Sequence, residues 1–166
     1  PSGDNRKNKN IGFRFRHSGN REKRIHLSDS LKLIGHELEY LMKIVPPDSI
    51  PGRGKDFFLL YFSGYDCDPC IFRSFELLKI IKQLNWETLV VLSDGSVGEI
   101  RRKFDYNGYI YQDHDFLLNR QLNYTGTPVL LILDSLLIIK STYHPGEFDE
   151  ESMKCFENFL KKVDVF

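Results

Sequence analysis

The chain has 166 residues, of which 41% are apolar and 13% aromatic, a composition that excludes a largely disordered protein and allows one sizeable core. No apolar run approaches the roughly 18 residues that are needed to span a bilayer. Three cysteines are too few for a disulfide-stapled scaffold, and the lack of a second cysteine pair excludes a zinc ribbon.

Charge is unevenly distributed along the chain, although the formal net charge is zero. Residues 1–25 contain eight Lys or Arg and two acidic residues, a balance of +6, so the remainder carries −6. A basic arm can bind nucleic acid or anionic lipid, or serve as a juxtamembrane tether. This arm has no dense basic run, so we predict a solvated segment, flexible over residues 1–10, and no nucleic-acid partner.

Residues 11–55 are predicted to add a hairpin and a helix to the domain. Alternating apolar and basic residues predict a β-hairpin over residues 11–27, with its turn at 18–20. Apolar residues at helical spacing then predict an additional N-terminal helix over residues 30–44, which Pro46 ends.

Strand and helix patterns alternate from residue 56 onward. The predicted strands cover residues 57–63, 88–92, 109–112, 129–133 and 136–140, the last two joined by a two-residue turn at 134–135. The predicted helices begin after Cys67 and cover, further on, residues 97–104, 113–122 and 149–162. The first of these helices is apolar nearly all round, so we expect it to be well buried. The order predicts one α/β domain over residues 11–166, with a mixed sheet between helices.

Cys67 and Cys70 stand three residues apart at the start of a predicted helix, closely after a buried strand. Such a pair can close a small disulfide ring or exchange disulfides. The helix N-terminus is expected to lower the pKa of the Cys67 thiol, while Asp66 and Asp68 raise that pKa by repulsion. Arg73, within two turns along the helix, is expected to offset part of the repulsion, which leaves a modest net depression.

The order of these elements, with CxxC at the first strand–helix junction and Thr127-Pro128 opening the β-hairpin, resembles the thioredoxin superfamily over residues 56–163. A hairpin over residues 11–27 would make the chain similar to TlpA/ResA-type and AhpC/TSA-like proteins, which carry one. The resemblance implies a thioredoxin-like α/β/α sandwich with a mixed central sheet.

The resemblance also implies a role for each residue of the site. Cys67 would attack a substrate disulfide, and Cys70 would resolve the mixed disulfide. Pro128 would be a cis-proline facing the pair, and Thr127 would offer backbone hydrogen bonds to the substrate. The substrate-binding surface would also include three residues around the cysteines, Tyr65, Asp68 and Pro69, of which the proline matches that of the thioredoxin CxPC motif.

Some positions depart from the pattern of the superfamily. Thioredoxins have Trp directly before the first cysteine, where this chain has Asp66. Their buried Asp, six residues before that cysteine, is Tyr61 here, and the Glu of ResA-type proteins is Arg73. Asp66 and Glu76 are therefore the acidic alternatives for proton handling. Gly64 stands where peroxiredoxins have Thr, which argues against peroxidase activity.

We therefore expect a thiol–disulfide oxidoreductase that reduces protein disulfides without a cofactor or metal, receives electrons from an upstream reductant and acts as a monomer. The resemblance implies a periplasmic or membrane-anchored bacterial protein, tethered N-terminal to Pro1. Two alternatives stay open: a non-catalytic adaptor that holds a partner between CxxC and Thr127-Pro128, and a metal site completed by Cys155, His114 or His144.

Two further groups of residues have a simpler reading. Asp113, His114 and Asp115 could form a catalytic constellation, but their place before an apolar run favours a helix cap. Cys155 is expected to take no part in the chemistry of the site. A tyrosine cluster is expected to pack on the sheet and its rim: Tyr106, Tyr109 and Tyr111.

Overall fold

Five short segments of the chain form one mixed β-sheet within the residues that the structure describes. The computed structural model describes residues 31–51, 54–123, 126–146 and 150–163. The sheet has the order β3-β2-β1-β4-β5. The strands are β1 (Phe57–Phe62), β2 (Thr88–Leu92), β3 (Tyr111–Gln112), β4 (Val129–Leu133) and β5 (Ile139–Tyr143).

The pairing of the central strands brings three loops to one edge of the sheet. β1 runs parallel to β2, with Phe62 opposite Leu92, and antiparallel to β4, with Tyr61 opposite Val129. The C-terminal ends of β1 and β2 therefore meet the N-terminal start of β4. The loop after β1 carries Cys67, so the register alone places Pro128 close to that loop.

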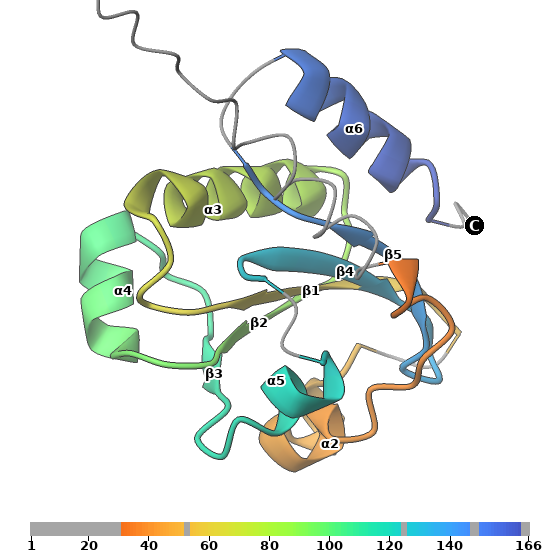
Figure 1. Cartoon of the computed structure of the whole chain (residues 1–166), viewed down its shortest axis with the longest axis horizontal. Coiled ribbons are helices and arrows are strands. Elements are labelled where there is room, and N and C mark those ends of the chain that lie inside the picture. Colours follow the sequence, from red (N-terminus) through yellow and green to blue (C-terminus); the bar gives the residue numbers. More distant parts are fainter. Residues whose placement is uncertain (1–30, 52–53, 124–125, 147–149, 164–166) are drawn as a thin grey trace, which may run out of the picture.

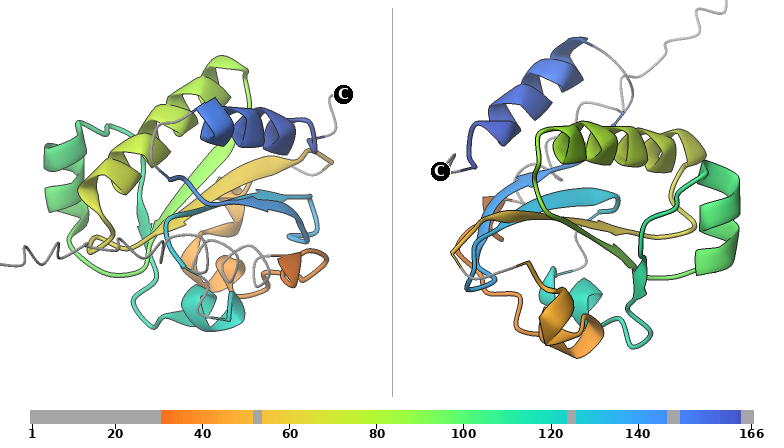
Figure 2. Two further views of the ribbon diagram at one scale, coloured as in Figure 1. Left: turned by 45° about the horizontal axis from the view of Figure 1, so that its top comes forward. Right: turned by 180° about the vertical axis from the view of Figure 1, so that it is seen from behind.

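Helices cover both faces of the sheet, which gives three layers (Figures 1 and 2). α3 and α6 lie on one face and α2 and α5 on the other, while α4 lies beside the start of α3. The helices are α2 (Leu41–Ile44), the 3-10 helix η1 (Pro47–Ser49), α3 (Asp68–Gln83), α4 (Val97–Phe104), α5 (Leu117–Gln121) and α6 (Glu150–Leu160). No helix in the described part of the chain is long and apolar enough to cross a membrane.

The alternation of side chains along β1 divides the core into two clusters. Phe58, Leu60 and Phe62 contribute to the cluster under α3 and α6. Phe57, Leu59 and Tyr61 contribute to the cluster on the face that α2 and α5 cover. All six residues of β1 are buried, as expected for a strand covered on both faces, and this confirms the predicted buried strand.

The prediction that α3 is buried nearly all round is only partly correct. Seven of its residues are buried, on the side that faces the sheet and α6. Phe72 and Leu84 are about half exposed, at 51% and 53%. The apolar surface of α3 is therefore wider than the part of this helix that the sheet and α6 cover.

The helix predicted over residues 30–44 is wrong over most of the length that the structure describes. Helix is present at Leu41–Ile44, while residues 32–40 form turns and an isolated bridge between Glu37 and Ile138. Gly35 adopts a φ of +88°, which an L side chain rarely adopts, and its N–H donates to the carbonyl of Ile139. Backbone pairing with β5 replaces the helical hydrogen bonds. The predicted hairpin at residues 11–27 and the arm at 1–10 lie outside the described residues.

The β4–β5 connection is longer than the predicted two-residue turn. The Asp134 side chain accepts hydrogen bonds from the N–H groups of Leu136 and Ile138, and Leu137 adopts a φ of +62°. This capped loop delays the second strand, which runs over Ile139–Tyr143 instead of residues 136–140. Strand pairing is otherwise antiparallel, as the sequence predicts.

Candidate active site

Cys67 and Cys70 form a disulfide at the N-terminus of α3, with their Cα atoms 5.2 Å apart. Cys67 is the N-cap residue, with extended backbone angles, and its sulfur accepts a hydrogen bond from the Cys70 N–H at 3.2 Å. Cys67 is exposed and Cys70 is half-buried. The helix N-terminus therefore points its free N–H groups at the more accessible sulfur.

The two residues between the cysteines form the first turn of α3 and remain at the surface. Pro69 occupies a first-turn position, where a missing N–H costs nothing. The Asp68 carboxylate forms an ion pair with the Lys103 ammonium of α4 at 2.7 Å. Sequence reasoning missed Lys103, which is 35 residues away from its partner. Both groups are more than half exposed, so the pair contributes less than about 1 kcal/mol to stability.

The loop between β1 and Cys67 is held against the start of α4. The Gly64 N–H donates to the Asp94 carbonyl at 2.7 Å. A Cβ at Gly64 would lie 3.0 Å from that oxygen and 3.3 Å from the Cα of Gly95. Such distances are tighter than ordinary contacts, so this close approach of two backbones requires a glycine.

Asp66 connects the same loop to the start of β4. Its carboxylate accepts the Ser63 N–H at 2.8 Å with one oxygen and the Thr127 hydroxyl at 2.7 Å with the other. Burial raises the pKa of the Asp66 carboxyl above its ordinary 3.8, although the two hydrogen bonds oppose the shift. The sequence marks Asp66 as an acidic alternative, and the structure places it directly between the two predicted halves of the site.

The Thr127–Pro128 segment lies on the β4 side of the site. The peptide bond between the two residues is cis. Pro128 is buried and Thr127 is half-buried, and the strand register sets them beside the end of β1. The hydrogen bond to Asp66 links this segment to the residue before Cys67. Tyr65 is 80% exposed in the same loop, so its ring is accessible to a partner.

Tyr61 occupies the position where thioredoxins have their buried Asp, and it has a carboxylate as its partner. Its hydroxyl donates to Asp113 across 3.0 Å. Burial and the Asp113 carboxylate raise the pKa of Tyr61 far above its ordinary value, so the phenol is neutral. Asp113 also accepts the N–H groups of Leu117 and Leu118, so its carboxylate caps the start of α5 as predicted. The helix itself is shorter than predicted, because it runs over Leu117–Gln121 instead of residues 113–122 and its N-cap position is Phe116, with a φ of +53°.

Arg73 and Glu76 do not take part in the site as the sequence suggests. Arg73 is 1% exposed, and its guanidinium contacts the sulfur of Met153 on α6. It is therefore directed toward α6, whereas Lys103 is the cation that pairs with Asp68 at the surface. Glu76 forms an ion pair with Lys79 at 2.6 Å. Asp66 is therefore the acidic alternative that reaches the site.

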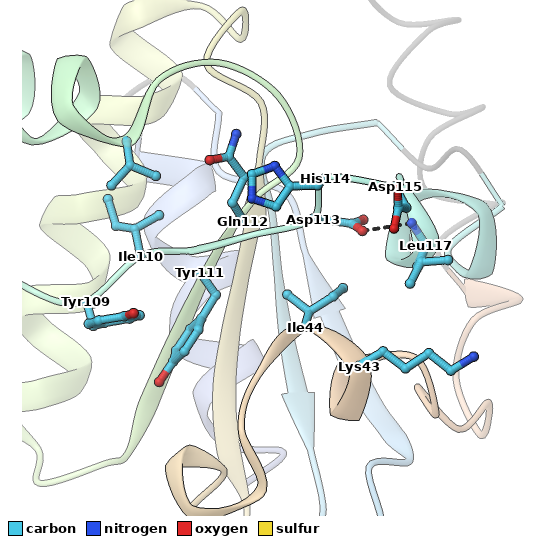
Figure 3. A pocket seen from close by; sticks show the side chains of 11 residues that line it. Lys43, Ile44, Tyr109, Ile110, Tyr111, Gln112, Asp113, His114, Asp115 and Leu117 are labelled. Carbon is cyan, nitrogen blue, oxygen red and sulfur yellow. Dashed lines mark hydrogen bonds between the residues drawn. The ribbon is translucent and has the colours of Figure 1, made fainter.

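A pocket of about 390 Å³ lies between α2, β3 and the start of α5 (Figure 3). Tyr109, Tyr111 and His114 contribute to its lining, and the first two rings are 4.5 Å apart. The dashed line in Figure 3 marks the Asp113–Leu117 cap. The lining of the pocket includes neither Cys67 nor Cys70, so the pocket is separate from the disulfide. The third predicted tyrosine, Tyr106, stacks on Phe75 instead, with ring centroids 4.6 Å apart.

The alternative hypothesis of a metal site is not supported by a set of ligands in the described part of the chain. Within residues 31–51, 54–123, 126–146 and 150–163, no three His, Cys, Asp or Glu side chains could hold an ion. Cys155 is an exposed, free thiol on α6. His114 is exposed, and in Figure 3 it lies on the side of Asp113 that is opposite to Leu117. None of these residues joins the Cys67–Cys70 pair.

Comparison with known proteins supports the fold. No protein-family model matches the sequence, and no curated protein sequence does. A thioredoxin-like protein in its oxidised form is 15% identical, with a TM-score of 0.52 over 72% of this chain and 86% of the other. A structure described as thiol:disulfide interchange protein DsbE, from Chlorobium tepidum, is 14% identical, with a TM-score of 0.51 over 70% and 84%.

These matches and the sheet order define the class of the protein: it has a thioredoxin-like fold. The predicted fold class is thereby confirmed. Within that fold, Asp66, which precedes the CxxC disulfide at the N-terminus of α3, accepts a hydrogen bond from Thr127, which precedes the cis-proline.

Proposed function

We propose that this protein is a thiol–disulfide oxidoreductase that reduces protein disulfides through Cys67 and Cys70. One observation carries the proposal: an exposed sulfur at a helix N-terminus accepts the N–H of its own half-buried partner. The same N–H would stabilise a Cys67 thiolate, which is the nucleophile in disulfide exchange. The cis-proline segment beside it supports a role in binding an extended peptide.

The reaction balances with the two cysteines and a substrate disulfide alone. The Cys67 thiolate attacks one substrate sulfur, so that a mixed disulfide forms and the second substrate sulfur leaves as a thiolate. The Cys70 thiolate then attacks the Cys67 sulfur and displaces the first. Two electrons pass to the substrate, which is protonated to a dithiol, and the protein ends as the disulfide seen in the structure.

The charges around Cys67 support the reducing direction of this proposal. The helix N-terminus favours the thiolate, whereas Asp66 and Asp68 disfavour it, and Lys103 neutralises only the second of these. The reduced form is therefore not strongly stabilised, which favours a reductant. A redox titration against glutathione tests this, and a potential above about −150 mV would overturn the reducing direction.

Insulin reduction with dithiothreitol tests the activity itself. We expect catalysis by the wild type, its loss in Cys67→Ser, and retention in Cys155→Ser, which removes the free thiol on α6. Cys70→Ser should trap mixed disulfides and thereby identify substrates. A wild type without activity would favour the adaptor alternative, in which the same surface holds a partner without exchange.

The compartment and the electron donor are part of the same proposal. A protein that ends each cycle oxidised needs a dithiol donor to start the next one. We propose that the protein acts outside the cytoplasm of a bacterium, as its resemblance to TlpA/ResA-type proteins implies. Fractionation of cells that express the full-length protein tests this placement, and recovery in the cytoplasm alone would contradict it.

A further inference from the structure

Asp66 joins the two loops of the candidate active site. One carboxylate oxygen accepts the Ser63 N–H and the other accepts the Thr127 hydroxyl. Cys67 directly follows Asp66, and Pro128 directly follows Thr127. One side chain therefore ties the loop of the attacking thiol to the segment expected to bind the substrate backbone.

We propose that Asp66 is a positioning residue for disulfide exchange, which holds Thr127 in the orientation that a peptide substrate needs. This inference rests on the proposed function and adds to it a determinant of substrate class. It predicts that the contact between Asp66 and Thr127 matters for disulfides within a peptide chain and not for small disulfides, which make no backbone contacts.

The carboxylate is the fixed partner in this contact. Ser63 follows β1 directly and its N–H binds one carboxylate oxygen, while Gly64 holds the same loop against Asp94. The loop is thus closed by its own Ser63–Asp66 bond and held against the segment that follows β2. A hydrogen bond from a hydroxyl to a carboxylate is short and strong, here 2.7 Å, so it can fix the hydroxyl and its backbone.

The same geometry argues against proton transfer as the role of Asp66. Each carboxylate oxygen already has a donor, one from the backbone of Ser63 and one from the side chain of Thr127. The side chain is directed toward the start of β4 through this second contact. Apart from the repulsion that its charge exerts on a Cys67 thiolate, Asp66 therefore acts through its contact with Thr127.

Four variants separate position from charge. Asp66→Asn removes the charge but can keep both contacts, because its oxygen accepts from Ser63 and its amide donates to the Thr127 oxygen. Asp66→Ala removes the charge and both contacts. Thr127→Val removes the hydroxyl at nearly constant shape, and Thr127→Ser restores it. Glu87→Ala, in an exposed residue before β2, is the matched control for loss of a carboxylate.

The experiment measures two rate constants for each pre-reduced protein by stopped flow. One substrate is a short fluorescent peptide with an internal disulfide, and the other is 5,5′-dithiobis(2-nitrobenzoate). We expect Asp66→Ala to react with the peptide about fivefold more slowly than Asp66→Asn, because of its two lost contacts only the hydrogen bond to Thr127 reaches the peptide-binding segment. Thr127→Val should slow the peptide reaction by a similar factor, and Thr127→Ser should rescue it.

The small disulfide and the double variant complete the test. Asp66→Ala and Asp66→Asn should react equally fast with the small disulfide, because both lack the same charge. Asp66→Ala combined with Thr127→Val should be no slower than the slower of the two single variants, since both remove the same contact between Asp66 and Thr127. Equal losses with both substrates, or a peptide rate in Asp66→Ala equal to that in Asp66→Asn, would overturn the inference. A wild type that reacts with neither disulfide would instead overturn the proposed function.

Discussion

The hydroxyl of Tyr61 donates a hydrogen bond to the carboxylate of Asp113 across 3.0 Å, at the end of the sheet where β1 and β3 approach α5. The two residues are 52 positions apart. Asp113 is fully buried, and it is satisfied by the phenol together with the N–H groups at the start of α5. The contact thus joins the central strand to a helix on the far side of the sheet from α3.

Loss of this buried carboxylate should destabilise the protein. Asp113→Ala leaves the Tyr61 hydroxyl and three helix N–H groups without this acceptor, and we expect it to lower the free energy of unfolding by about 2–3 kcal/mol. Tyr61→Phe should cost about 1 kcal/mol. Urea denaturation measures both. The exposed neighbour Asp115→Ala serves as the control, and an equal loss in that variant would contradict the role of the cap.

The Asp68–Lys103 pair should tune the redox potential of the disulfide. Lys103→Ala leaves the negative charge of Asp68 uncompensated beside Cys67, which disfavours the thiolate and so the reduced form. We expect the potential to fall by about 10 mV, because the pair is exposed and 30 mV corresponds to about 1.4 kcal/mol. Asp68→Asn should raise the potential instead. Equilibration with glutathione measures both shifts.

Salt gives an internal control for that prediction. The effect of an exposed charge is screened at high ionic strength, so the difference between Lys103→Ala and wild type should disappear in about 1 M salt. Lys79→Ala removes a comparable exposed cation that pairs with Glu76. A shift of the same size in Lys79→Ala would show that the effect depends on net charge and not on the pair.

Gly64→Ala should be destabilising although the residue lies in a loop. The added Cβ would meet the Asp94 carbonyl at 3.0 Å and the backbone of Gly95 at 3.3 Å, and neither can yield without moving the loop. We expect a loss of about 1–3 kcal/mol in unfolding free energy and slower disulfide exchange. Gly98→Ala, in α4, where the added Cβ would meet the Ser96 hydroxyl oxygen at an ordinary contact distance of 3.9 Å, should be neutral or stabilising by up to about 1 kcal/mol. Similar losses in both variants would argue against the close approach.

The Asp66 carboxyl should make stability depend on pH. Its pKa is raised above 3.8 in the folded protein, so between 3.8 and the raised value the folded state binds more protons than the unfolded state. The stability that this group contributes is fully present below pH 3.8 and is lost as pH rises through the folded-state pKa. The free energy of unfolding of wild type, measured relative to Asp66→Asn, should therefore fall over that window. A difference that is constant with pH would contradict a raised pKa.

Thr127→Val offers a second test of the same titration. It removes a hydrogen bond that favours the charged carboxylate, so the pKa of Asp66 should rise further. The carboxyl ¹³C shift of Asp66 in an NMR titration reports that pKa directly. A pKa unchanged from wild type would show that the hydroxyl of Thr127 has no electrostatic effect on Asp66.

Local patterns in the sequence were sufficient for much of the fold. The apolar runs of β1 and β2 and the capped helix at Val97–Phe104 depend on neighbouring residues, and their observed bounds match the prediction closely. The helix predicted over residues 30–44 failed because its apolar spacing competes with pairing to β5. Gly35 turns the chain toward Ile139, and that competitor is about 100 residues away in the sequence.

The sequence by itself determined that two thiols stand at the start of a helix after a buried strand, because spacing and capping are local properties. Only the tertiary structure decided what surrounds them. Lys103 reaches Asp68 from 35 residues away, and Thr127 reaches Asp66 from 61. Strand register and helix packing create these contacts, and no local pattern along the chain encodes them.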